Sequence, residues 1–517
     1  MGIVAKQTLS NSAILFFGAL LGAINVMLLY PMVLPDQEIG LTRILISFTV
    51  LFSQLASLGG GAMLMKFIPV YNNGRGAYKG AANFIFLIGV FGFFTLSGAL
   101  YFSKPLFEYF YLENAQLFIE YFFFLLPLVF FYILLNYFNG LLQANFITVF
   151  PNFLNEILIR LLNTVILVLY SLELLSFYHF MILFVSCYAL VSLISFGYLL
   201  KHKKVTLNLS VKFCFQDKIQ VLKYGFANTL TSLASNISNR IDLIMIGSLL
   251  GGIAVYGDAK DFNMGLYYVT IYTIASYMAT LIEMPARALS NIASAVISKA
   301  WNDNDIDLIG SLYRKSSINQ IIIGALIFVG IWINIDSLLI ITGKDYSSGK
   351  YVFLFLAIGK LINVISGVNG KIIILSKYYF VGTVLTFFLA CITFVSNSFF
   401  IPYFEGLPSF LGIEGAAIAT AISVFLFNFL SFLFLAFKYK LQPFSIKTVL
   451  VLLVTLMCLF LDNLLDLNFG FYLEIALKST FVFILYVALT YFLKLSDDFN
   501  RIVDKSFHHI FAFIIRK

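Results

Sequence analysis

Charged residues are scarce in this sequence: Asp, Glu, Lys and Arg make up 11% of the 517 residues, whereas hydrophobic residues make up 61%. A soluble domain usually carries about 25% charged residues, so lipid must surround most of this chain. In lipid, every backbone N–H and C=O group needs an internal partner, which leaves helices or a closed barrel. Barrel strands alternate apolar and polar residues over about ten positions. The apolar runs here last about 20 residues, and this length predicts helices.

Cysteine is also rare, with Cys187, Cys391 and Cys458 in apolar runs and Cys214 in a basic loop. This distribution favours neither a disulfide framework nor a metal site. The sequence has no His/Cys/Asp cluster, no glycine-rich phosphate loop and no Walker signature. We therefore expect no cofactor, no ATP hydrolysis and no enzymatic activity.

Apolar windows recur along the whole chain and predict an all-α polytopic membrane protein with about 14 transmembrane helices. The windows are 9–33, 41–65, 80–101, 119–143, 153–171, 174–200, 225–249, 263–298, 317–340, 351–376, 379–401, 412–437, 448–466 and 471–493.

The positively charged residues fall mainly on one side of these predicted spans. If the N-terminus is cytoplasmic, about 22 Lys and Arg residues lie in cytoplasmic segments. Only four lie on the other side, namely Lys104, Lys260, Lys344 and Lys350. This bias predicts an N-in, C-in topology, and it explains the net charge of +8 without a nucleic-acid partner.

The longest polar connection, which contains Lys201, Lys203 and Lys204, divides the predicted helices into groups. We predict an N-terminal six-helix lobe, a basic cytoplasmic linker, a C-terminal six-helix lobe, two extra transmembrane helices and a cytoplasmic tail. Their bounds are 1–200, 201–224, 225–440, 441–494 and 495–517. Both lobes start on the same side, as in parallel transporter repeats that bind substrate where the repeats meet.

Several predicted spans carry polar residues on one helical face. In the window 263–298, polar residues from Thr273 to Ser294 follow each other at steps of three and four, which keeps them on one side. Gly, Ser and Thr positions alone are explained by close helix packing. A Lys or Arg in mid-bilayer costs about 2.5–3.5 kcal/mol, so each requires a partner or a hydrated cavity.

We therefore single out ten residues as candidates for a polar cavity. They are Asn25, Arg43, Asn239, Arg240, Asp242, Thr280, Glu283, Arg287, Lys360 and Asn363. Glu283 and Arg287 are four residues apart and can neutralise each other. Arg43 can equally sit at the outer interface. No acidic residue lies three or four positions from Lys360 on its own span. Lys360 is therefore the strongest single candidate.

Two glycine or proline positions mark weak points in the predicted helices. Pro285 interrupts the hydrogen-bond ladder between Glu283 and Arg287. Gly59-Gly60-Gly61 offers a comparable weak point in the second predicted span. Flexible helices at matching positions suit a rocking transporter, although packing alone can also select them.

One string of residues resembles a known family. Gly412-Ile413-Glu414-Gly415-Ala416-Ala417-Ile418-Ala419-Thr420-Ala421 is similar to a segment of polysaccharide-export flippases, the O-antigen flippases of the Wzx type. These belong to the multidrug/oligosaccharidyl-lipid/polysaccharide (MOP) superfamily. The opening Lys6-Gln7-Thr8-Leu9 before a glycine-rich span and the layout of six, six and two helices also resemble that group.

The resemblance implies a monomeric flippase of the bacterial cytoplasmic membrane that works by alternating access. Its cargo would be an undecaprenyl-diphosphate-linked oligosaccharide for O-antigen-like or capsule-like surface polysaccharide. Membrane lipids and polysaccharide polymerase or export components would be its partners. Because guanidinium and ammonium groups suit phosphate oxygens, Arg43, Arg240, Arg287 and Lys360 become hypothesised diphosphate contacts. The other six candidates become cavity or ion-coupling residues.

Two other functions remain open. A drug or cation antiporter of the same superfamily would hold unpaired carboxylates in its cavity, whereas the candidates here are mostly cationic. A membrane-embedded glycan polymerase or ligase usually needs a large extracytoplasmic loop. The largest such loop predicted here, around 103–117, has only about 15 residues.

Overall fold

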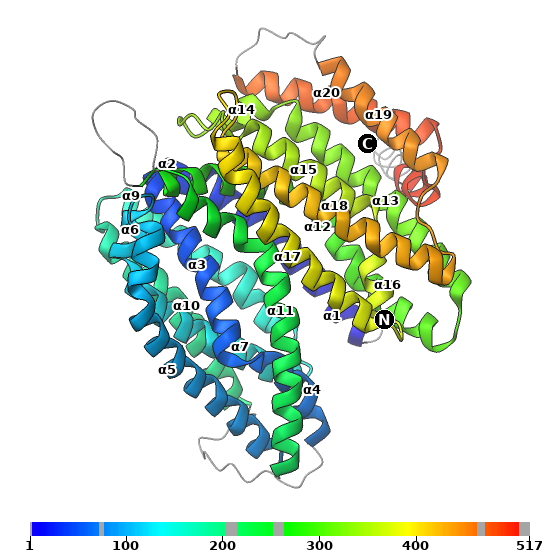
Figure 1. Cartoon of the computed structure of the whole chain (residues 1–517). Coiled ribbons are helices and arrows are strands. Elements are labelled where there is room, and N and C mark those ends of the chain that lie inside the picture. The colour runs from blue at the N-terminus through cyan, green and yellow to red at the C-terminus, as the bar shows by residue number, and fades with distance from the viewer. Residues whose placement is uncertain (1–2, 72–76, 203–214, 252–262, 463–470, 506–517) are drawn as a thin grey trace, which may run out of the picture. The chain divides into compact units, whose positions relative to one another are not determined.

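The computed structural model describes residues 3–71, 77–202, 215–251, 263–462 and 471–505, and within these ranges every regular element is a helix (Figure 1). The all-α fold predicted from the apolar windows is thus confirmed. Parts of the predicted linker (203–214) and tail (506–517), together with Lys260, lie outside the described residues.

The first half of the chain is built from α-helices, two π-helices (η1 and η3) and one 3₁₀-helix (η2). In order these are α1 (Ile3–Ile24), η1 (Asn25–Leu29), α2 (Tyr30–Val33), α3 (Asp36–Ser57), α4 (Gly60–Tyr71), α5 (Ala77–Tyr111), α6 (Gln116–Glu120), η2 (Phe122–Phe124), α7 (Leu125–Ala144), α8 (Val149–Phe153), η3 (Leu154–Leu158), α9 (Ile159–Ser171), α10 (Phe177–Lys201) and α11 (Phe215–Leu249).

The second half contains α-helices only. In order these are α12 (Met264–Asn302), α13 (Ile306–Trp332), α14 (Ile335–Ile340), α15 (Gly349–Ile365), α16 (Asn369–Leu375), α17 (Tyr379–Glu405), α18 (Gly412–Tyr439), α19 (Ile446–Asp462) and α20 (Phe471–Phe492).

Eleven helices of the described chain are long and apolar enough to cross a membrane, or twelve if the bent pair α15–α16 forms one span. Two further predicted spans correspond to α11, whose polar face lowers its hydropathy, and to α19, which is apolar over 446–460 only. The chain is therefore a multi-pass membrane protein. The exact number of spans and the N-in, C-in topology stay predictions.

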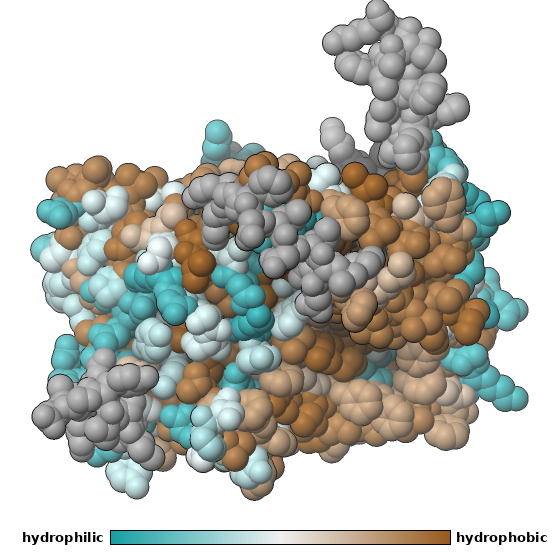
Figure 2. All heavy atoms as spheres, turned by 90° about the horizontal axis from the view of Figure 1, so that it is seen from above, coloured by the Kyte–Doolittle hydropathy of each residue, from teal (hydrophilic) through white to brown (hydrophobic). Residues whose placement is uncertain are grey.

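The surface of the molecule agrees with a lipid environment. Large hydrophobic side chains stand exposed on many helices, among them Phe102 on α5 and Phe437 on α18. Hydrophobic residues also occupy large areas of the face shown in Figure 2. In water these areas would drive association, whereas in a bilayer they contact acyl chains.

Contacts within the chain define two compact units, and the division falls inside α12, α17 and α18. Unit 1 comprises residues 1–273 and 393–416, and unit 2 comprises residues 274–392 and 417–517. In unit 1, α3 packs against α5, α7 and α11, while α7 also packs against α4 and α10. In unit 2, α13 packs against α15, α19 and α20. The predicted division into two lobes and two extra helices stays a prediction.

In unit 1, the helical path from α3 to α4 is interrupted where glycines weaken the backbone hydrogen-bond ladder. Helix α3 ends at Ser57, Leu58 adopts a left-handed conformation (φ 46°), and α4 begins at Gly60. The interruption coincides with the glycine run singled out above. In unit 2, by contrast, α12 stays helical past Pro285.

Close packing between α3 and α5 gives a direct test of the fold. A Cβ atom at Gly92 would lie 1.9 Å from the Ala56 carbonyl oxygen, whereas a Cβ at Gly98 on the same helix would meet nothing within 4 Å. We expect Gly92→Ala to lower the free energy of unfolding by about 1–3 kcal/mol through overpacking. Gly98→Ala should be neutral or raise it by about 0.5–1 kcal/mol, because Ala favours helix. Thermal unfolding of the two purified variants measures the difference. Equal melting temperatures would contradict this packing.

Candidate functional site

A polar seam joins the first and fifth predicted spans in unit 1. Asn25, the first residue of η1, donates from Nδ2 to the Arg160 carbonyl oxygen at 2.9 Å and accepts from Thr164 Oγ1 at 2.9 Å. Arg160 also pairs with Glu156 of η3 at 2.8 Å. The π-helices η1 and η3 therefore both contribute to this seam, and π-turns occur frequently at functional sites.

Glycines of α1 make room for that ion pair. A Cβ at Gly18 would lie 2.7 Å from Glu156 Cβ, and a Cβ at Gly22 would lie 3.0 Å from Arg160 Cζ. Glu156 and Arg160 neutralise each other at intrahelical spacing. The structure thus places the candidate Asn25 in a packed helix seam.

Arg43 on α3 forms no ion pair with an acidic residue in the part of the chain that the structure describes. Its Cζ atom lies 4.6 Å from the centre of the Tyr30 ring, a cation–π contact. Its Nε and Nη2 atoms are buried and have no hydrogen-bond partner among the described residues.

Three candidates on α11 differ in environment. Asp242 is buried and accepts hydrogen bonds from the Tyr272 hydroxyl and, at 2.7 Å, from Asn397 Nδ2. Arg240 is partly exposed. Asn239 is exposed and its amide bonds to Ser235 O of its own helix. Of these three, only Asp242 is bonded to side chains of other helices.

In unit 2, Glu283 of α12 is the centre of a charged cluster. Its Oε2 atom lies 3.2 Å from Lys360 Nζ and 3.2 Å from Arg287 Nη2, and its Oε1 accepts from Asn363 Nδ2 at 2.9 Å. Glu283 is 6% exposed. The Arg287 side chain is 62% exposed, and that of Lys360 is 23% exposed. One carboxylate thus faces two cations, which leaves a net positive charge.

Hydrogen bonds between asparagine side chains connect the Glu283 cluster to the bend between α15 and α16. Asn428 of α18 donates to Asn363 Oδ1 at 3.3 Å and accepts from Asn369 Nδ2 at 3.0 Å. Helices α15 and α16 meet there at an angle of 52°, with Gly367 at φ 58°. The remaining candidate, Thr280, donates from Oγ1 to Ser276 O of its own helix.

Unit 1 also contains a polar cavity of about 370 Å³, bounded by α3, α4, α7, η3 and α11. The ten candidates singled out from the sequence include none of the residues that line this cavity, and thus none of the three amides supplied by α7. Their signal was available as a polar face, Asn136, Asn139 and Gln143, on an otherwise apolar helix.

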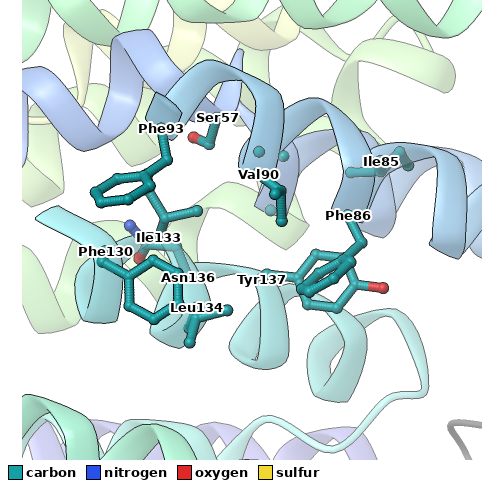
Figure 3. Close-up of a pocket in the computed structure, with 13 residues that line it drawn as sticks. Ser57, Ile85, Phe86, Val90, Phe93, Phe130, Ile133, Leu134, Asn136 and Tyr137 are labelled. Carbon is teal, nitrogen blue, oxygen red and sulfur yellow. The ribbon is translucent and has the colours of Figure 1, made fainter. Parts of the chain in front are cut away.

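A second cavity of about 20 Å³ borders the polar one and shares Ser57 and Asn136 with it (Figure 3). Its wall is otherwise mostly hydrophobic, with Phe93, Phe130 and Ile133 labelled in the same view. A cavity of this volume holds about one water molecule. It is therefore a packing gap, and of these two neighbouring cavities the polar one has room for a ligand.

The family described as "Polysaccharide biosynthesis protein" matches residues 4–301. This chain belongs to that family. The match covers all of the unit 1 residues discussed above except Asn397, and it includes Glu283 and Arg287. The search of curated protein sequences found no match to this chain.

Solved structures share its fold. An inward closed structure of the lipid II flippase MurJ superposes with a TM-score of 0.70 at 18% identity, covering 93% of this chain and 98% of MurJ. An inward-facing multidrug resistance MATE family transporter of the MOP superfamily gives a TM-score of 0.62 at 17% identity, covering 84% and 94%. An outward-facing MATE structure gives 0.57 at 16% identity, covering 84% and 96%. The family match thus confirms the predicted resemblance to a polysaccharide family, and the solved structures show that the chain shares the polytopic fold of MurJ and of MATE transporters.

Proposed function

We propose that this member of the polysaccharide biosynthesis family is a flippase of the bacterial cytoplasmic membrane. Its cargo is an undecaprenyl-diphosphate-linked oligosaccharide used for surface polysaccharide, and it works by alternating access as a monomer. The observation that carries the proposal is the family membership, together with a fold shared along nearly the whole chain with a lipid II flippase.

The cations found in each unit support an anionic cargo. Arg43 in unit 1 has buried donors that find no partner among the residues the structure describes, and unit 2 holds Lys360 and Arg287 on a single carboxylate. Cations at membrane depth are costly and mark substrate or ion pathways. A diphosphate supplies oxygens that accept charge-assisted hydrogen bonds from such groups.

Glu283 acts in this proposal as a stand-in for phosphate. Its two oxygens accept from Lys360, Arg287 and Asn363. A diphosphate carries more negative charge than a carboxylate, so it competes for the same donors. Lys360 and the more exposed Arg287 would then move from Glu283 to the cargo.

The alternative of a drug or cation antiporter has one observation in its favour. Asp242 is a buried carboxylate in a fold shared with MATE transporters. Its oxygens are, however, occupied by the Tyr272 hydroxyl and the Asn397 amide. Proton-dependent dye efflux in a pump-deleted host would support this alternative.

The decisive experiment is to identify the lipid-linked species that accumulates when the gene is deleted. We expect complete undecaprenyl-diphosphate-linked repeat units on the inner leaflet and loss of surface polysaccharide, because assembly continues while transfer stops. Mass spectrometry of lipid extracts and leaflet-specific labelling measure this. A plasmid copy of the wild-type gene is the control and should reverse both effects. Single repeat units already on the outer leaflet would instead indicate a polymerase.

A further inference from the structure

The polar cavity of unit 1 has an unusual wall. Of its 17 lining residues, seven carry a side-chain carboxamide and none carries a charge. Six of these amides come from the helices α3, α7 and α11: Gln54, Asn136, Asn139, Gln143, Asn228 and Asn236. The seventh, Asn155, comes from η3. Such a wall is costly in a membrane protein unless the amides have partners.

These amides do not satisfy one another. Among the described residues, the single side-chain hydrogen bond that any of them makes runs from Asn228 Nδ2 to Ser232 Oγ at 3.4 Å. The Oδ1 atoms of Asn139 and Asn155 are buried and accept no hydrogen bond from any residue that the structure describes. Asn139 is only 6% exposed. A packed structural network would instead have paired its amides.

The backbone also opens toward this cavity. The interruption between α3 and α4 places Gly59 (φ 67°), Gly60 and Gly61 in the cavity wall. A Cβ at Gly59 would lie 2.8 Å from Asn228 Nδ2. Non-helical backbone at membrane depth is tolerated where it is buried in protein or lines a hydrated cavity, and interrupted helices line substrate sites in transporters.

The chemistry of the wall selects one class of ligand. A carboxamide both donates and accepts hydrogen bonds, so it matches sugar hydroxyl groups, which do the same. It cannot neutralise a phosphate or a carboxylate, which favour Arg and Lys. The volume of about 370 Å³ falls at the lower end of the range of about 300–1,000 Å³ typical of ligand sites. The small apolar cavity beside it (Figure 3) offers no competing polar site.

We propose that the carboxamide cavity binds the uncharged sugars of the cargo, and that it selects neutral glycans over those with acidic sugars at this position. The inference rests on the proposed flippase function and deepens it. The diphosphate is then bound by cations elsewhere, while sugar hydroxyls satisfy the free amides of the cavity.

The test measures binding to the full-length protein in lipid nanodiscs. The probes are undecaprenyl diphosphate, the same lipid carrying a neutral hexose disaccharide, and the same lipid carrying a disaccharide with a terminal hexuronic acid. The wild type should bind the neutral glycolipid more tightly than the other two. Asn139→Leu and Asn228→Leu should each weaken binding of the neutral glycolipid about tenfold, the scale of one lost buried hydrogen bond. Binding of the bare lipid should change less than twofold.

Two further variants sharpen the result. Gln116→Leu removes an amide on α6 outside the cavity and should leave all three affinities unchanged. Asn139→Asp keeps the side-chain shape but adds a negative charge. It should weaken binding of the acidic glycolipid more than binding of the neutral one.

The outcomes separate this inference from the function it rests on. A wild type that binds neither bare nor glycosylated lipid overturns the flippase proposal and the inference together. A wild type that binds bare, neutral and acidic lipids equally overturns the inference alone. Asn139→Leu and Asn228→Leu variants that weaken all probes equally, or none, also overturn it.

Discussion

Replacement of Glu283 by Leu should lower the free energy of unfolding by about 3 kcal/mol, because it leaves a partly buried Lys360 without its acid. The ammonium group would lose its 3.2 Å contact and sit in an environment where only 23% of its side chain is exposed. Asn363 would lose an acceptor at the same time. Thermal unfolding of purified protein and its level in membranes both report the effect.

The double variant Glu283→Leu/Lys360→Met separates stability from transport. It removes both charges, so we expect the protein level to recover, because an apolar pair can replace an ion pair. Polysaccharide export should stay absent if Lys360 binds the diphosphate. Glu108→Leu is a matched control, since Glu108 pairs with Lys104 at 3.3 Å on α5, where the two side chains are 40% and 33% exposed. A more exposed pair of this kind contributes about 0.5 kcal/mol. A Glu283→Leu variant as stable as this control would refute the central role of Glu283.

Arg43→Met should abolish polysaccharide export without lowering protein stability. The Nε and Nη2 donors of Arg43 are buried and make no hydrogen bond within the described ranges, where the guanidinium instead contacts the Tyr30 ring. Removing the charge relieves a desolvation cost, and functional residues are often kept at the expense of stability. We expect export to fall at least about 100-fold, as for loss of a charge-assisted contact. Surface polysaccharide per unit of membrane-embedded protein is the measurement.

Two control variants test whether the effect of Arg43→Met on export is specific to this residue. Arg43→Lys should retain part of the export, because the charge remains while the planar fork of donors is lost. Lys104→Met removes a cation from the exposed pair with Glu108 on α5 and should have no effect on export. Normal export in Arg43→Met would exclude this residue from the diphosphate site.

The helices were predictable because each is a long apolar run whose ends carry polar residues. The window 379–401, for example, agrees with α17 within a few residues at its C-terminal end. The windows could not show where a span is interrupted. Gly59-Gly60-Gly61 gave a local signal for the break between α3 and α4, but the bend at Gly367 depends on contacts of α15 and α16 with other helices.

The candidate site was predictable only one helix at a time. Spacing along α12 pairs Glu283 with Arg287, and the structure has this contact. The same spacing leaves Lys360 without an acid, whereas in the structure Glu283 reaches it from a different helix. Contacts between spans follow from helix rotation and tilt, which periodicity does not determine. The carboxamide cavity was missed for the same reason, since its amides come from helices far apart in sequence.

The π-helical turn at Asn25–Leu29 connects α1 to Tyr30, whose ring contacts Arg43 on a different helix, α3. A π-turn contains one more residue than an α-turn, and each residue of a helix turns the chain by about 100°. If this turn tightened to α geometry, the following residues would rotate by about that angle relative to α1. Tyr30 comes directly after it and covers the Arg43 guanidinium. A change of winding in one helix would therefore uncover the charge on its neighbour, without any movement of α3 itself.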